Sequence, residues 1–213
     1  KVVETHLKNG NLSGVNLRGA DLEGASIVGG SLEGTDLSDV SMVGGRFEGV
    51  DWSETVLSGA DLSRARIEGG RFKKIDFQSV ELVEAGFLNV GFRDCKFDNK
   101  NIEEIVLNGC DFEDCSLIDA SLRRVKASGT TFSRCTLTGA SMSESDFSES
   151  DFSGSRVNGA VFHDSDVTAS GFRGADIEGA DFSKAKAGRC DFSGAFAVGS
   201  IFVGADLRYV ELS

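Results

Sequence analysis

Few residues of this chain are of the types that carry out acid–base or metal chemistry, and they are poorly placed for it. The two histidines, His6 and His163, are far apart in the sequence, and neither has an obvious partner for a general base or a metal site. The chain contains no phosphate-binding glycine loop ending in Lys-Ser/Thr and no nucleophile elbow. We therefore expect no enzymatic activity, no metal site and no cofactor.

The five cysteines all occupy the same position of a five-residue repeat: Cys95, Cys110, Cys115, Cys135 and Cys190. Three of them, Cys95, Cys115 and Cys135, follow one another at every twentieth position, and in a coil of that length they would lie close enough for a disulfide by distance alone. Their odd number, the lack of Cys-x-x-Cys spacing and their exchange with Ala and Ser in the repeat favour buried free thiols instead. Free thiols indicate a reducing compartment, so we expect a cytoplasmic protein.

The elements that position these residues follow from a period of five. From Leu7 to Leu212, every fifth residue is apolar, and 15 of the 16 phenylalanines occupy this central position. The position two residues before the central one is also expected to face inward, and this second inward position mostly holds small residues such as Ala60 and Ser150. The position two residues after the central one is frequently Gly. A period of five fits neither a helix nor a strand, so the chain must turn within every repeat.

A second period of twenty is superimposed on the first. Every twentieth residue from Phe72 to Phe192 is Phe, as expected if four repeats complete one coil and like side chains stack between coils. The two periods predict a four-sided, all-β solenoid that comprises residues 1–213 as a single domain. It would contain about ten and a half such coils and have a length of about 50 Å at the usual strand spacing.

Repeats such as Ala20-Asp21-Leu22-Glu23-Gly24 and Ala60-Asp61-Leu62-Ser63-Arg64 resemble the A-(D/N)-(L/F)-x-x signature of the pentapeptide-repeat family, and the resemblance covers essentially the whole chain. It implies a right-handed quadrilateral parallel β-helix. The repeat is least regular over about 71–106, where Gly disappears from the corner and the second inward position holds Ile75, Lys100 and Ile105. We expect a bend, bulge or altered turn there, near Lys100; drift in a tolerant segment is the alternative.

The surface charge is the remaining functional signal. The formal net charge is −12, and grouping the outward residues by the period of twenty makes three sides acidic and one nearly neutral. The most acidic side carries eleven acidic and five basic residues. Such a rod repels nucleic acid and anionic membranes and attracts basic grooves, so we expect a protein partner. Candidate contact residues on the most acidic side are Asp21, Asp61, Glu81, Glu103 and Asp181.

Two functions fit these observations. The family resemblance implies a DNA mimic, because pentapeptide-repeat proteins of similar length bind DNA gyrase and topoisomerase IV and protect them from quinolones or peptide toxins. The net charge density, about one per 4 Å of rod against about one per 1.7 Å of duplex DNA, makes the mimicry partial. The alternative is a rigid scaffold or spacer that mediates protein–protein interaction and has no topoisomerase role.

Two further surface features are candidate contacts. Outward positions turn apolar near the C-terminus, which predicts a homodimer through the C-terminal coils, with contact to a further C-terminal segment as the alternative. The dimer patch comprises Phe196, Val198, Ile201, Val203 and Tyr209. A weaker candidate is an irregular basic belt formed by Lys73, Lys74, Arg93, Lys96 and Lys100.

Overall fold

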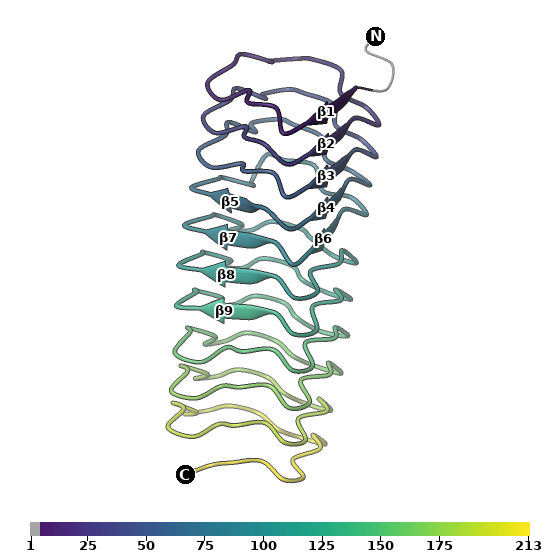
Figure 1. Cartoon of the computed structure of the whole chain (residues 1–213). Helices are drawn as coiled ribbons and strands as arrows, with labels where there is room; N and C mark the ends of the chain where they lie inside the picture. The colour runs from purple at the N-terminus through teal and green to yellow at the C-terminus, as the bar shows by residue number, and fades with distance from the viewer. Residues whose placement is uncertain (1–4) are drawn as a thin grey trace.

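The computed structural model describes residues 5–213, which wind into a stack of four-sided coils with the N-terminal and C-terminal residues at opposite ends (Figure 1). One ladder of parallel bridges starts at His6, continues to Ser26 and reaches Asp206, with one bridge at every twentieth position. The coil length and the quadrilateral parallel β-helix predicted from the sequence are therefore confirmed. Within the described residues, no helix is long and apolar enough to cross a membrane.

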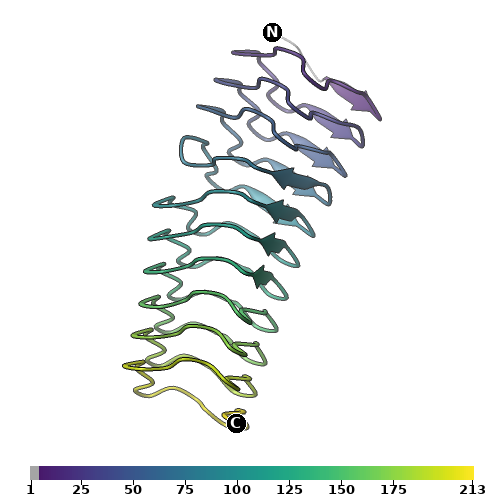
Figure 2. The ribbon, with the colours of Figure 1, turned by 90° about the vertical axis from the view of Figure 1, so that its left-hand side faces the viewer.

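Short three-residue strands occur on two adjacent sides of the rod. The first sheet has the order β1 (His6–Lys8), β2 (Ser26–Val28), β3 (Arg46–Glu48), β4 (Arg66–Glu68) and β6 (Gly86–Leu88). The second has the order β5 (Arg71–Lys73), β7 (Gly91–Arg93), β8 (Asp111–Glu113) and β9 (Thr131–Ser133). Figure 2 faces the second sheet. Beyond it, isolated parallel bridges continue the same pairing to Glu211.

We number the four sides by their central residues in the first coil: side 1 contains Leu7, side 2 Leu12, side 3 Leu17 and side 4 Leu22. The first sheet lies on side 1 and the second on side 2. The central positions form the core, and the phenylalanines of side 2 stack in one column from Phe72 to Phe192. Successive ring centroids are 4.5–5.4 Å apart with interplanar angles of 6–13°. This spacing is close to the strand separation, so backbone pairing and ring stacking have the same repeat.

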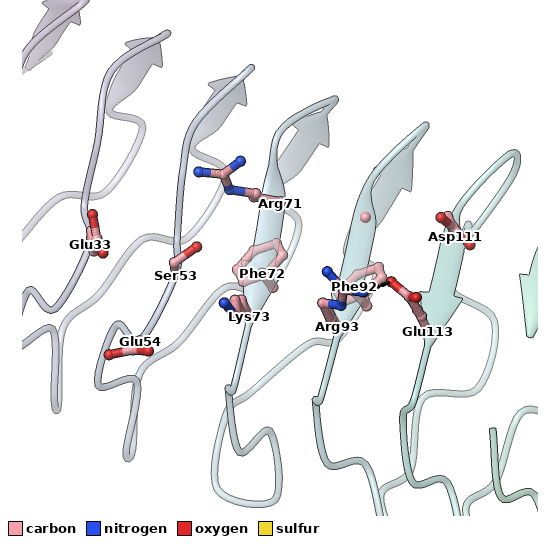
Figure 3. A pocket seen from close by; sticks show the side chains of 11 residues that line it. Glu33, Ser53, Glu54, Arg71, Phe72, Lys73, Phe92, Arg93, Asp111 and Glu113 are labelled. Atoms are coloured by element: carbon pink, nitrogen blue, oxygen red, sulfur yellow. Dashed lines mark ion pairs between the residues drawn. The ribbon is translucent and has the colours of Figure 1, made fainter. Parts of the chain in front are cut away.

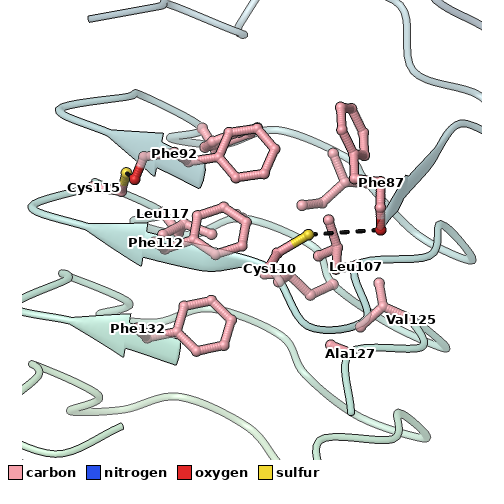
Figure 4. Packing of buried hydrophobic residues seen from close by; sticks show 14 of the residues in the cluster. Phe87, Phe92, Leu107, Cys110, Phe112, Cys115, Leu117, Val125, Ala127 and Phe132 are labelled. Carbon is pink, nitrogen blue, oxygen red and sulfur yellow. Dashed lines mark hydrogen bonds between the residues drawn. The ribbon is translucent and has the colours of Figure 1, made fainter. Parts of the chain in front are cut away.

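The second inward position has a hydrogen-bonding role that composition alone did not reveal. When it holds Thr, Ser or Cys, the side chain commonly donates to the carbonyl of the central residue 23 positions earlier. Thr35 Oγ1 donates to Leu12 O at 2.7 Å, and Cys110 Sγ donates to Phe87 O at 3.6 Å (Figure 4). A small donor can thus replace Ala here without leaving a buried polar atom unpaired. All five cysteines are free and buried, as their odd number and their exchange with Ala and Ser predicted.

The corners of the coil require a left-handed backbone. The corner residue is the one two positions after the central residue of each repeat. From Asn9 to Tyr209 it has a φ between 52° and 73°, with Ser79 as the exception. About half of these residues are not glycine, which is tolerable because their side chains point outward into open space. Gly70 differs, because it is an inward residue with φ 75°, and a Cβ there would lie 2.2 Å from Val50 O.

The hydrogen-bonded ladder between coils is interrupted at two places, one at the start of the irregular stretch 71–106 and one within it. Among residues 5–213, no backbone hydrogen bond joins 55–59 to 75–79 on side 3, and none joins 80–84 to 100–104 on side 4. We call these the side-3 gap and the side-4 gap. The coil that contains β5 also departs from the outline of the coils below it at the left edge of Figure 2. The altered turn lies at Ser79, whereas the corner before Lys100 keeps the usual conformation, with φ 56° at Asn99.

The gaps occur where bulky residues replace small ones at the second inward position. Ile75 begins the lower edge of the side-3 gap, and Lys100 and Ile105 flank the lower edge of the side-4 gap. The Lys100 side chain leaves the core and is half-buried, and its Nζ donates to Gln78 O at 3.3 Å. That carbonyl lacks its usual ladder partner, because Gly59 N donates to Ser79 Oγ instead. Lysine therefore replaces a backbone donor that the altered turn removes.

A glycine pair tests the corner geometry. Gly70→Ala should lower the free energy of unfolding by at least about 2 kcal/mol, because the new Cβ would collide with a backbone carbonyl and the φ is strained. Gly154→Ala should cost about 1 kcal/mol, since φ is 66° but nothing lies within 4 Å of the new Cβ. Urea unfolding followed by circular dichroism measures both. Equal losses in the two variants would contradict the proposed collision.

The buried thiols predict a specific pH dependence of stability. Burial raises the pKa of Cys110 to about 12 and that of Cys190 to about 11. Both values exceed the unfolded value of about 8.5, so each thiol should remove up to about 1.4 kcal/mol of unfolding free energy per pH unit above that pH, until its folded pKa is reached. Below pH 8 the effect should be absent.

The matched comparison is Cys110→Ala/Cys190→Ala, because Ala is common at this inward position. Unfolding free energies measured from pH 7.5 to 10 should fall less steeply for this variant than for the unchanged protein. Parallel pH profiles would show that the two thiols ionise as readily in the folded protein as in the unfolded chain.

Candidate protein-interaction surface

The residues proposed for the acidic contact lie on side 4 but do not form one continuous row. The bridges connect Asp21, Ser41, Asp61 and Glu81 in successive coils. Five coils then separate Glu81 from Asp181, and the intervening positions are Asn101, Ser121, Ser141 and Val161. The structure thus brings Asp61 and Glu81 side by side in neighbouring coils and leaves Asp181 isolated from them.

The aspartates of this row have a structural role as well as a charge. Asp21, Asp61 and Asp181 each accept a hydrogen bond at Oδ1 from the backbone N–H two residues later, at 2.8–3.1 Å. This is the Asx-turn arrangement that stabilises a tight turn. The pKa of Asp181 is lowered chiefly by its hydrogen bond from the Ser183 hydroxyl. Side-chain hydrogen bonding within the repeat therefore accounts for Asp at this position without any partner.

Part of the acidic charge on side 4 is neutralised by arginine. Arg124 contacts Glu103 at 3.0 Å and Glu104 at 2.9 Å, and its pKa is raised chiefly by its hydrogen bond to Glu104. No ion pair within residues 5–213 involves Glu81 or Glu84, and both side chains are exposed. Glu84 was not among the sequence candidates, because a corner residue gives no repeat-position signal. Asp21, Glu23, Asp61 and Asp181 also form no ion pair within residues 5–213, and Asp61, Glu81 and Glu84 lie together in two neighbouring coils.

The basic belt divides among three sides. Lys73 on β5 is paired in register with Arg93 on β7, and together with Arg71 they border a shallow hollow of about 340 Å³ on side 2 (Figure 3). Arg93 contacts Glu113 at 2.8 Å, and Lys74 contacts Glu54 at 2.8 Å. Lys96 lies on side 3, and Lys100 at the second inward position that begins side 4. The belt is therefore a mixture of charges rather than a continuous basic surface.

The apolar residues near the C-terminus are exposed on adjacent sides of the last coils. Val198 and Val203 are each 73% exposed and Tyr209 is 82% exposed, with Phe196 and Ile201 beside them. Leu207 and Leu212 occupy central positions of the repeat but are also exposed, because no further coil covers them in the structure. Sequence pattern alone assigned these two leucines to the core.

Within residues 5–213, the two histidines lie in different coils. His163 Nε2 lies 2.9 Å from Asp164 on side 4, whereas His6 is in the first coil. In the column Cys95, Cys115 and Cys135, hydrogen bonding with the neighbouring Cys115 thiol, and then burial, raise the pKa of Cys95 and of Cys135. Across the part of the chain that is described, no three His, Cys, Asp or Glu side chains gather closely enough to hold a metal ion.

Comparison with known proteins agrees with this architecture. The model described as pentapeptide repeats (8 copies) matches residues 3–39 and 46–78, and the model described as a pentapeptide repeat region matches residues 105–182. Together they cover more than half of the chain. A search of curated protein sequences finds no match.

Solved structures of pentapeptide-repeat proteins are similar to the chain. HetL, involved in heterocyst differentiation regulation in the cyanobacterium Nostoc sp. strain PCC 7120, has 21% identity and a TM-score of 0.57, over 95% of this chain and 89% of HetL. A protein of the Arabidopsis thaliana thylakoid lumen has 25% identity and a TM-score of 0.42, over 43% of this chain and 63% of its own. QnrB1, a plasmid-mediated fluoroquinolone resistance protein, has 19% identity and a TM-score of 0.37, over 98% and 92%.

The similarity to HetL supports the fold alone, because the identity is low. The family matches depend on the repeat itself, and they begin near the start of the repeat pattern and continue beyond the irregular stretch. The repeat, the four-sided coil and the stacked core are all those of one family. The chain belongs to the pentapeptide-repeat family.

Proposed function

We propose that the protein is a non-catalytic rod that binds a basic surface of another protein through side 4. The observation that carries this proposal is the group of uncompensated carboxylates Asp61, Glu81 and Glu84 on the most acidic side of a rigid rod. A fixed row of charge attracts a complementary groove and repels nucleic acid and anionic lipid. As part of the same proposal, the protein acts in the cytoplasm, which its free thiols support.

As the specific partner we propose a type II topoisomerase, DNA gyrase or topoisomerase IV, whose DNA-binding groove would accept the rod in place of a duplex. A length of about 50 Å and net negative charge support this choice. A rigid scaffold without a topoisomerase role is the second candidate. It is favoured by the many carboxylates that pair with arginine or lysine on the rod itself, such as Glu103 and Glu113, and are less available to a partner.

Charge reversal tests the acidic contact. Asp61→Lys/Glu81→Lys should weaken binding to gyrase by about tenfold or more, since each reversal turns an attraction of about 1 kcal/mol into a repulsion. The readout is a supercoiling assay with ciprofloxacin, in which the unchanged protein should relieve the inhibition in a dose-dependent manner. Raising the salt concentration from about 50 to about 200 mM should reduce the effect.

The matched control is Glu68→Lys/Asp146→Lys on side 1, which changes the net charge equally. Asp146, like Asp61, accepts a hydrogen bond from the N–H two residues later, and it also accepts one from the Ser148 hydroxyl, so the control loses one hydrogen bond more than the tested variant. The control should protect gyrase nearly as well as the unchanged protein, while both variants fold. No effect of the unchanged, folded protein on gyrase over a wide concentration range would favour the scaffold and direct the search to pull-down partners.

We also propose a two-fold homodimer through the C-terminal coils. Val198→Asp/Val203→Asp should shift the protein from dimer to monomer in size-exclusion chromatography with light scattering, because it places charge in an apolar contact. Val56→Asp, an exposed valine far from this patch, should leave the mass unchanged. A monomeric unchanged protein would contradict the dimer and assign the patch to another segment or partner.

A further inference from the structure

The side-4 gap differs from every regular coil contact in its unused backbone groups. We call the segment of one coil on one side a rung. One coil earlier, three hydrogen bonds join neighbouring rungs: Leu62 N to Glu81 O, Arg64 N to Val83 O, and Glu81 N to Ala60 O, at 2.8–2.9 Å. Within residues 5–213, the equivalent bonds of the next rung pair are missing. The N–H groups of Leu82, Glu84 and Asn101 and the carbonyls of Val80, Asn101 and Glu103 therefore have no backbone partner.

These groups border a hollow open to solvent. Its volume is about 540 Å³, and it is lined by 81–84 from one rung and by 100–105 from the next. The lining is partly apolar, because Val83 is 62% exposed and the buried side chains of Leu82, Ile102 and Ile105 form the floor. The hollow thus combines free backbone donors and acceptors with apolar surface, as an unpaired sheet edge does.

The charge around the hollow selects the kind of occupant. Glu81 and Glu84 are on one edge and Glu103 and Glu104 on the other, and Lys100 lies between them. The adjacent coils add Asp61 and Arg64 next to the first edge and Arg124 next to the second. Five carboxylates against three cations leave a net charge of −2 around the hollow. The side-3 gap lacks this bias, because its edges carry the Lys74–Glu54 ion pair and Asp76.

We propose that the side-4 gap binds an extended, basic peptide segment of a partner protein by β-strand addition. The segment pairs its backbone with the free groups of the gap, directs apolar side chains toward Val83 and the floor, and directs Lys or Arg toward Glu81 and Glu84. The exposed edge spans about four to five residues, since a strand advances about 3.3 Å per residue. This inference rests on the proposed function, because it supplies the chemistry of the partner that side 4 binds.

A peptide panel tests the inference directly on the full chain. The probe is a fluorescent Lys-Val-Lys-Val-Lys peptide with blocked ends, measured by fluorescence anisotropy at low salt. Its matched control has the same sequence with N-methyl groups on the two valine amides, which keeps the charge and removes backbone donors. We expect the N-methylated peptide to bind at least about tenfold more weakly. Equal affinities would overturn strand addition and leave only charge attraction.

Closing the gap gives a second test that separates pairing from charge. Lys100→Ala/Ile105→Ala restores small residues at the second inward position, which favours the regular ladder, and also makes the hollow more acidic. Charge attraction alone predicts that the peptide binds this variant as tightly or more tightly. Strand addition predicts at least about tenfold weaker binding. Unchanged or tighter binding would overturn the inference.

Hydrogen exchange on the unchanged protein keeps the inference testable if that variant does not fold. The amides of Leu82, Glu84 and Asn101 should exchange faster than those of Leu62, Arg64 and Glu81, and the peptide should slow the first group at least about tenfold. Binding without this protection would overturn the inference. Peptide binding and hydrogen exchange do not use a topoisomerase. A negative gyrase assay would therefore overturn the specific partner, whereas the peptide measurements alone would decide whether the side-4 gap binds an extended segment.

Discussion

The ladder of parallel hydrogen bonds that joins each coil to the next is the constraint on which the rest of this structure depends. It fixes the separation between coils at the separation of strands, and the side-2 phenylalanines stack at nearly the same distance. It also requires each coil to close after four repeats, which imposes a left-handed corner at almost every fifth residue. Because the ladder consists of local pairs, a departure in one rung remains local, as the two gaps show.

The sequence was sufficient to predict the parts that this ladder repeats many times. The unbroken apolar position from Leu7 to Leu212 gave the core and the coil length, because each error of register would expose a whole column of side chains. The second inward position was predicted as small, but its hydrogen bonds were not, since Thr35 and Cys110 find their acceptors in the preceding coil. Leu207 and Leu212 were misassigned because repeat position says nothing of whether another coil covers them.

The candidate interaction surface was predictable only in part, for reasons of side-chain geometry. Charge per side follows from the period of twenty, yet which carboxylates are neutralised depends on arginines one coil away, as Arg124 is from Glu104. The irregular stretch was visible as bulky residues at small positions. Its consequence was not, because Lys100 leaves the core and the ladder opens beside it, while the corner geometry changes at Ser79.

The distinction between Asp and Glu on side 4 separates structure from function. An Asp before the central residue accepts the N–H of its own turn, so Asp21, Asp61 and Asp181 are explained by the repeat even without a partner. Glu81 occupies the same position, but it accepts no such hydrogen bond. Its charge therefore has no role in the turn, and it lies, with Glu84, beside the gap between two coils of side 4 where backbone groups are also unused. Glu81 and Glu84 are therefore the residues of this surface that the repeat chemistry explains least.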